Sequence, residues 1–151
     1  MRATARALAI EITEAFADRQ RPPAGSLSEA PTNDDGTAHF FADKSWEDLT
    51  AAHLMKHRSA LSFFTPSAFA YFLPAFLNAA AETGDVDLID AVVSAVTPPK
   101  NNPRRPSYWR WWALLTSSQQ RVVIKCLRHW DSLEHGNLQA AADALEATVA
   151  A

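Results

Sequence analysis

Residues 63–77 read FFTPSAFAYFLPAFL, and this run of aromatic and alanine residues is the most distinctive feature of the chain. Thr65 is placed to cap a helix that begins at Pro66, since a proline in the first helical turn lacks only an amide that has no partner there. Pro74 then falls inside the helix, where it costs about 3 kcal/mol unless packing holds the bend. The run therefore predicts a buried, bent helix. Its inaccessible residues should include Phe69, Phe72, Leu73 and Phe76.

Helical spacing of apolar residues continues on both sides of this run. The expected helices cover about residues 3–20, 45–57, 65–83, 85–96, 116–135 and 137–149. Glycine and proline interrupt the pattern in two places, which predicts a mobile loop over about residues 21–39 and a proline-rich loop over about 97–107. No segment alternates strongly between apolar and polar residues, as a half-buried strand would. The sequence therefore predicts a single all-α domain over residues 1–151, a bundle of about six helices.

Capping residues mark where several of these helices begin. Ser45 followed by Asp48 approximates a capping box for the second helix. Thr116 with Gln119 forms a capping box for the fifth helix, and Asn137 is placed to cap the last one. These residues predict helix starts within a residue or two of their own positions.

The turn after the aromatic helix carries its own signals. Gly84 is placed to end that helix and Asp85 to start the next one. The apolar residues of the next helix recur at helical spacing, so they should share one face. That face consists of Val86, Ile89, Val92, Val93 and Val96.

Composition and charge place the chain among ordinary globular proteins. Its 151 residues are 48% hydrophobic and 21% charged, and the formal net charge of −3 does not favour nucleic acid as a partner. The single cysteine, Cys126, permits no internal disulfide and fits a reducing compartment. Glu11 and Glu14 interrupt the apolar stretch that an export signal needs, and prolines interrupt the longest apolar run. We therefore expect a cytoplasmic protein that does not span a membrane.

Two histidines are candidates for a metal site. His53 and His57 stand four residues apart on an expected helix, the spacing at which two imidazoles can share a metal ion. The residues between them lack the glutamate of the metalloprotease motif, Lys56 would repel a cation, and no third ligand is indicated. We therefore expect no metal and no cofactor. A metal-dependent enzyme at His53 and His57 stays an alternative function.

No residue pattern in the sequence indicates a catalytic centre. Cys126 lies on the apolar face of its expected helix, where a lone cysteine behaves as a small buried hydrophobe. His129 is three residues away, but the middle of a helix offers no oxyanion hole. Gly-rich phosphate loops, paired cysteines and nucleophile elbows are missing from the sequence. The sequence thus predicts a non-enzymatic protein.

A basic and aromatic region occupies residues 100–128. Seven Lys and Arg residues and no acidic residue lie between Asp90 and Asp131. We expect Trp109 and Trp112 in the core. The region then offers a contact surface made of Arg104, Arg105, Tyr108 and Trp111. This region supports an alternative function, a nucleic-acid- or nucleotide-binding regulator.

Acidic residues gather elsewhere, and they form the preferred partner-binding site. Helix N-terminal turns account for many of them, because carboxylates there interact favourably with the helix dipole. That reason does not apply to Asp34 and Asp35, because they lie in the first expected loop and not in the first turn of a helix. Complementary charge speeds association and selects the partner. We therefore predict that a protein partner contacts Asp34, Asp35, Asp87 and Asp90.

Three parts of the chain resemble a family of small uncharacterised bacterial proteins. The family pattern consists of a tryptophan, a block of the form fLtPeAFryyLPAy and a later LTpeQ helix start. Trp46, residues 60–76 and residues 114–123 carry this pattern. The chain departs from it at Ser67, where an acidic residue is common, and at Ala70, where a basic or polar residue is common.

The resemblance covers roughly residues 40–133 and carries no established activity with it. Small domains of this kind often look like immunity proteins, which bind and block a bacterial toxin. The resemblance therefore implies a non-catalytic inhibitor of a cognate toxin or effector, although membership of a family does not fix function.

Overall fold

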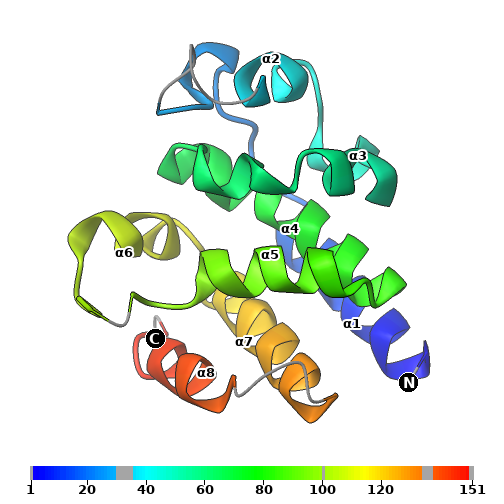
Figure 1. The fold of residues 1–151 in the computed structure, drawn as a ribbon, viewed down its shortest axis with the longest axis vertical. Helices are drawn as coiled ribbons and strands as arrows, with labels where there is room; N and C mark the ends of the chain where they lie inside the picture. The colour runs from blue at the N-terminus through cyan, green and yellow to red at the C-terminus, as the bar shows by residue number, and fades with distance from the viewer. Residues whose placement is uncertain (1, 30–35, 100, 134–137, 150–151) are drawn as a thin grey trace.

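A computed structural model describes residues 2–29, 36–99, 101–133 and 138–149 of the chain. Within these ranges the chain forms eight α-helices, three short 3₁₀-helices and no β-strand (Figure 1). An isolated antiparallel bridge joins Ser28 to Phe64. None of the helices in the described ranges is both long enough and apolar enough to cross a membrane. The predicted all-α fold is confirmed.

The helices have the following bounds. The α-helices are α1 (Arg2–Phe16), α2 (Thr37–Phe41), α3 (Ala51–Lys56), α4 (Pro66–Thr83), α5 (Val86–Val96), α6 (Pro106–Ala113), α7 (Ser117–Ser132) and α8 (Gln139–Glu146). The 3₁₀-helices are η1 (Ala24–Ser26), η2 (Trp46–Asp48) and η3 (Arg58–Ser62).

Two of these α-helices, α2 and α6, were not among the six expected from the sequence. α2 has five residues and α6 has eight, and helices this short depend on tertiary packing. η1 and the start of α2 fall within the segment expected to be a loop, about residues 21–39. α2 packs on η1, and α6 packs on α4. Contacts with other parts of the fold therefore stabilise both helices.

α4 is the central helix, and its start agrees with the sequence prediction. The Thr65 hydroxyl accepts a hydrogen bond from the backbone N–H of Ala68 at 3.3 Å, and Pro66 is the first helical residue. Pro74 lies inside the helix and is buried. The residues predicted to be inaccessible are all buried, namely Phe69, Phe72, Leu73 and Phe76. The prediction of a buried aromatic helix is confirmed.

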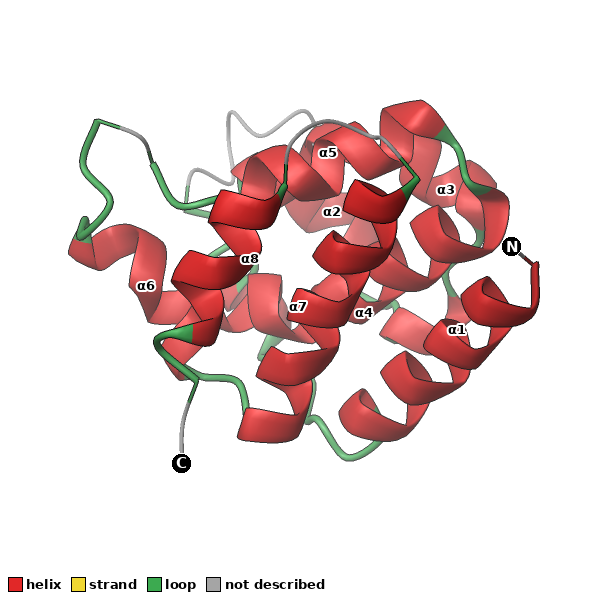
Figure 2. Cartoon of the chain, turned by 90° about the horizontal axis from the view of Figure 1, so that it is seen from below, coloured by secondary structure: helices red, strands yellow, loops and turns green. Residues whose placement is uncertain are grey.

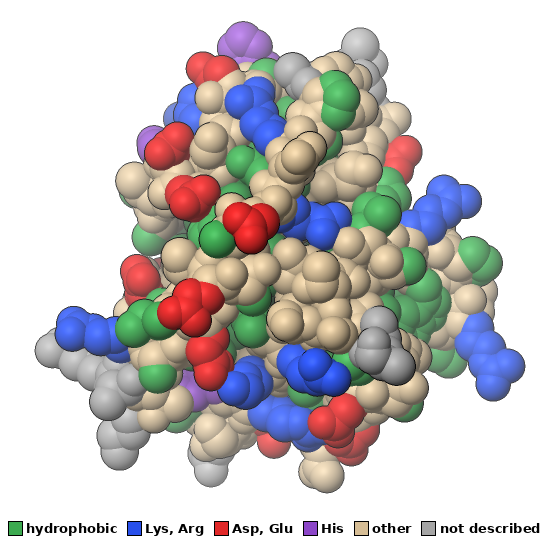
Figure 3. Space-filling model, turned by 180° about the vertical axis from the view of Figure 1, so that it is seen from behind, with side chains coloured by type: hydrophobic (Ala, Val, Ile, Leu, Met, Phe, Trp, Pro, Cys, Tyr) green, Lys and Arg blue, Asp and Glu red, His purple; other side chains and the backbone are tan. Residues whose placement is uncertain are grey.

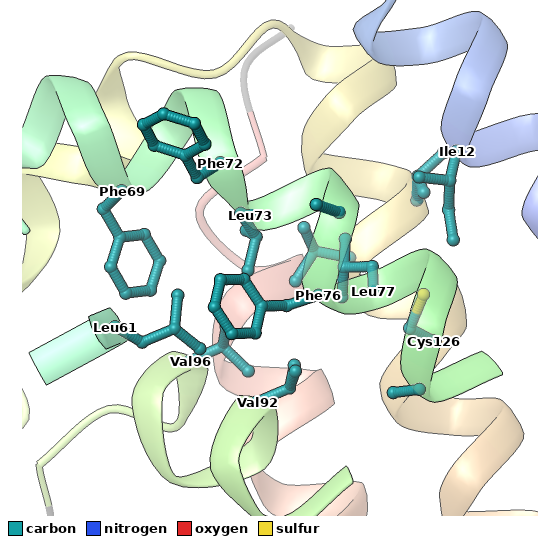
Figure 4. Close-up of a cluster of buried hydrophobic side chains, with 14 of the residues drawn as sticks. Ile12, Leu61, Phe69, Phe72, Leu73, Phe76, Leu77, Val92, Val96 and Cys126 are labelled. Carbon is teal, nitrogen blue, oxygen red and sulfur yellow. The ribbon is translucent and has the colours of Figure 1, made fainter. Parts of the chain in front are cut away.

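Most of the surface of α4 is covered by other helices. It packs against α1, α3, α5, α6 and α7, while α7 packs against α1 and α8 (Figure 1, Figure 2). Figure 4 shows the ring of Phe76 beside Val92 and Val96 of α5, whereas Leu77 faces the side of α1 and α7 on which Ile12 and Cys126 lie. A continuous hydrophobic core therefore surrounds α4.

The segment after η1 is attached to the start of α4. The backbone N–H of Thr65 donates to the Leu27 carbonyl at 3.0 Å, and that of Glu29 donates to the Phe63 carbonyl at 3.0 Å. The Thr65 hydroxyl, which caps α4, also donates to the Ser26 carbonyl at 2.7 Å. The first turn of α4 thus has both local and long-range hydrogen bonds.

Two predicted helix starts are confirmed. Gly84 ends α4 with a φ of 67°, in the left-handed region that favours glycine, and the Asp85 carboxylate accepts from the backbone N–H of Asp87 at 2.9 Å. Thr116 and Gln119 form a complete capping box at the start of α7. Local sequence therefore determines the start of α5 and of α7.

The predicted capping box at Ser45 and Asp48 is wrong. Ser45 makes no side-chain capping bond, and residues 46–48 form only η2. Leu49 adopts an extended conformation, which separates η2 from α3. The capping box that forms joins Thr50 to His53 at the start of α3.

Two further details differ from the sequence prediction, and a third falls outside the described residues. α1 ends at Phe16 instead of continuing to about residue 20. Val86 is 54% exposed and does not join the buried face of α5. Asn137, expected to cap the last helix, lies outside the described residues, and α8 begins at Gln139.

Candidate functional site

The predicted acidic contact residues divide into two groups. Asp34 and Asp35 lie outside the described residues. Asp87 and Asp90 lie one helical turn apart on α5, and both are exposed. Neither carboxylate has a hydrogen-bond or ion-pair partner among the described residues. Both are therefore available to another molecule.

The packing of α5 fixes the direction of these carboxylates. One face of the helix is buried against α4 and η3 and consists of Leu88, Ile89, Val92 and Val96. The face that this packing leaves to solvent carries Asp87, Asp90 and the exposed Val86. α5 thus presents an apolar side chain together with two carboxylates.

A cleft with a volume of about 230 Å³ lies between residues 46–51 and the second half of α4. Its lining includes the exposed side chains of Glu47, from η2, and Glu82, from the last turn of α4. Glu82 comes just before the turn that leads into α5. Along the chain, the helix that lines the cleft is thus followed directly by α5.

The floor of the cleft includes Asn78 from α4. The Asn78 Nδ2 donates to the Thr13 hydroxyl of α1 at 3.3 Å. The Asn78 Oδ1 is buried and has no hydrogen-bond partner among the described residues. The accessible oxygen acceptors of the cleft are therefore the carboxylates of Glu47 and Glu82, which suit an ammonium or guanidinium group.

We call these four carboxylates the acidic end, made of Glu47, Glu82, Asp87 and Asp90. The sequence predicted the two on α5 and missed the two in the cleft. The sequence does contain one residue that could have indicated the cleft, Asn78. An amide in the middle of an otherwise apolar helical stretch requires polar surroundings.

The basic and aromatic region is arranged differently from the prediction. Trp111 and Trp112 are 4% and 3% exposed, whereas Trp109 is only half-buried. The assignment of Trp112 to the core is confirmed. Trp109 packs against the edge of the core, so its assignment to the core is confirmed only in part, whereas the assignment of Trp111 to a contact surface is wrong. Trp111 turns toward α4, where its ring centroid lies 4.6 Å from that of Phe69.

The remaining residues predicted for this surface are Arg104, Arg105 and Tyr108. The two arginines are exposed just before α6. Tyr108 is half-buried, and its hydroxyl donates to the Val96 carbonyl at the end of α5. Burial raises the pKa of Tyr108 above its ordinary value. Tyr108 therefore attaches α6 to α5 and offers little free surface.

His53 in α3 and His57, the residue after this helix, have other partners. The His53 Nδ1 accepts from the backbone N–H of Thr50 at 3.3 Å within the capping box. The His57 ring stacks on Phe40, with ring centroids 4.0 Å apart and an interplanar angle of 19°. Burial, and after it the charges of Lys56 and His53, lowers the pKa of His57. Among the described residues no three His, Cys, Asp or Glu side chains are grouped as metal ligands would be.

Cys126 is fully buried on α7. Burial, and after it the charge of Glu11, raises the pKa of the Cys126 thiol. Both effects disfavour the thiolate, the form that a nucleophile requires. The geometry thus places Cys126 in the core.

A family model described as "Family of unknown function (DUF6714)" matches residues 4–148. No curated protein and no solved structure matches the chain. The matched range includes the acidic end, the cleft and the whole of α6.

Proposed function

The chain belongs to a family of unknown function, DUF6714, and we propose that it acts by binding a basic protein through the acidic end. The observation that carries this proposal is the placement of four carboxylates that have no cationic partner among the described residues. Two line the cleft and two lie on the exposed face of α5. Such a surface suits the lysine and arginine side chains of another protein.

The acidic end stands on well-packed elements. Glu82 belongs to α4, the central helix, and the start of α5 is held by the Asp85 cap. Carboxylates on packed helices need little ordering of the backbone when a partner arrives, which lowers the entropic cost of binding. Val86 adds an exposed apolar contact.

The most specific form of this proposal is an immunity-type inhibitor. A rigid acidic surface can cover a basic active-site cleft, and complementary charge then speeds association and selects the correct enzyme. The resemblance to a family of small uncharacterised proteins motivates this form, because small domains of that kind often look like immunity proteins. Asp34 and Asp35 stay predicted contacts of the same kind.

Charge reversal tests the proposal. The variant Glu82→Lys/Asp87→Lys/Asp90→Lys should lose the partner, because three favourable charge contacts become repulsive. A matched control reverses three exposed carboxylates on other parts of the surface, Glu14→Lys/Asp18→Lys/Glu29→Lys. Both variants have the same net charge, so a difference in partner binding between them is due to the positions of the substituted carboxylates.

Wild type, test variant and control are used side by side for affinity capture from cells of the source organism, with the bound proteins measured by quantitative mass spectrometry. A protein retained by wild type and control, and lost by the test variant, supports binding at the acidic end. A protein held equally by all three overturns this assignment. The activity of the captured protein, measured with and without wild type, then tests inhibition separately from binding.

A further inference from the structure

We propose that α6 carries a second interface, which binds an acidic segment of a protein. We call it the arginine surface and define it by Arg104, Arg105 and Arg110 around Trp109. It goes beyond the proposed function, because its residues and the charge of its partner differ from those of the acidic end.

The side chains of the three arginines are exposed. No ion pair or hydrogen bond engages their guanidinium groups within the part of the chain that the structure describes. The sequence between Asp90 and Asp131 contains no acidic residue that could neutralise them. In the space-filling view, Lys and Arg side chains project around hydrophobic surface at the edge of the molecule formed by α6 (Figure 3).

Hydrogen bonds hold α6 in place. The Trp109 Nε1 donates to the Pro103 carbonyl at 2.8 Å, which fixes its half-buried indole beside the arginines. The Tyr108 hydroxyl bonds to the Val96 carbonyl, and the Gln120 Nε2 donates to the Trp112 carbonyl at 3.0 Å. The backbone of α6 and the indole of Trp109 are thus held in place, so a partner has to order only the arginine side chains.

The arginine surface also has an apolar part. Leu114 follows α6 and is 44% exposed. It stands four residues after Arg110, so the two side chains lie on the same side of the helix. Tryptophan and arginine are enriched among the residues that contribute most to binding at protein interfaces. The chemistry fits a peptide segment that combines carboxylates with an apolar side chain.

Nucleic acid fits the same arginines less well. Proteins that bind single strands stack successive bases on several exposed aromatic rings. Here Trp111 and Trp112 are buried and Tyr108 is engaged by α5, which leaves Trp109 as the half-exposed ring of α6. The net charge of −3 also weakens attraction to a polyanion. An acidic protein segment can bind through the guanidinium groups and the apolar side chains beside them, and it does not require several exposed aromatic rings.

The test uses two fluorescent probes of equal charge, a Glu- and Asp-rich peptide that contains one leucine and an oligo-dT strand. Binding is followed by fluorescence anisotropy at physiological ionic strength. The test variant is Arg104→Gln/Arg105→Gln/Arg110→Gln. The control, Arg6→Gln/Arg21→Gln/Arg121→Gln, removes three exposed arginines elsewhere and has the same net charge. Since all six positions are exposed, thermal unfolding should show that both variants fold.

We expect wild type and control to bind the peptide more tightly than oligo-dT. The test variant should bind the peptide about tenfold more weakly, the sum of three exposed charge contacts. The Trp109 Nε1–H resonance should shift when the peptide binds. Tighter binding of oligo-dT, equal losses in both variants, or no binding of the peptide would each overturn the proposal.

Sedimentation of wild type and test variant adds one more outcome. Self-association of wild type that the test variant lacks would identify a second copy of this chain as the occupant and overturn the proposed partner. None of these outcomes depends on Glu82, Asp87 or Asp90, so the proposed function is tested independently.

Discussion

The Gln119 side chain joins α7 to α1, since its Nε2 donates to the Ala15 carbonyl at 3.1 Å. Gln119 is 4% exposed, and its Oε1 accepts from the backbone N–H of Thr116 at 2.9 Å and from Arg19 at 3.2 Å. Arg19 also donates to the Leu114 carbonyl at 2.8 Å. One amide thus caps a helix and attaches it to its neighbour, which gives a physical reason for the glutamine of the LTpeQ pattern.

Replacing Gln119 by alanine should lower the free energy of unfolding by about 1–3 kcal/mol, because the helix loses a cap and the α1 contact loses its hydrogen bonds. Urea denaturation measures this loss. Gln20→Ala, at an exposed glutamine, is the control and should change stability by less than about 0.5 kcal/mol. Equal effects of the two substitutions would contradict the role of Gln119.

Phe72→Ala should cost about 3–5 kcal/mol, as for other fully buried phenylalanines. The Phe72 ring contacts those of Phe41 and Phe64, with centroids 5.0 and 5.2 Å away. Phe63→Ala, at a half-buried position just before α4, should cost clearly less in the same urea titration. A loss below about 1 kcal/mol for Phe72→Ala would mean that its cavity collapses or that the site is not core.

The stability of the protein should depend on the protonation of His57. Its pKa is lowered in the folded state, mainly by burial, so the folded protein favours the neutral ring. The unfolded chain then binds more protons, and the stability due to this group is complete above the unfolded pKa of about 6.5 and decreases as the pH falls toward the folded pKa. Urea midpoints measured across this range should show a smaller decrease for His57→Gln, and an unchanged decrease for the exposed-site control His39→Gln.

Purified protein should contain no stoichiometric zinc or iron. The His53 Nδ1 is engaged by the Thr50 N–H, and the described residues supply no third ligand near His57. Metal analysis of the protein, prepared without chelators, checks this expectation. One metal ion per chain that disappears in both His53→Ala and His57→Ala would restore the metal-dependent enzyme as the function.

The elements that the sequence predicted well are those with local signals. The Thr65 cap with Pro66, the Gly84 turn and the Thr116 capping box depend on residues within one helical turn, and each forms as expected. The misplaced capping box at Ser45 shows the limit of such signals, because a suitable pair of residues also needs a helix that continues after it.

The buried face of α6 could have been predicted in part from the sequence, but four large aromatic residues within five positions made the choice of face difficult. Tyr108, Trp111 and Trp112 follow helical spacing and share one face, and Trp109, three residues before Trp112, lies at the edge of that face. Which face turns inward depends on contacts with Phe69 and Val96, residues far away in the chain. The cleft likewise depends on two segments that meet only in the fold, so local patterns could not reveal it.

The hydroxyl of Thr65 serves two structural units at once. It accepts from Ala68 within α4 and donates to Ser26, 39 residues earlier in the chain. Opening of the 26–29 segment therefore removes part of the helix cap, and fraying of α4 releases the segment. The amides of Thr65 and Glu29 are both bonded across this junction, so we expect them to open with a common free energy in native-state hydrogen exchange.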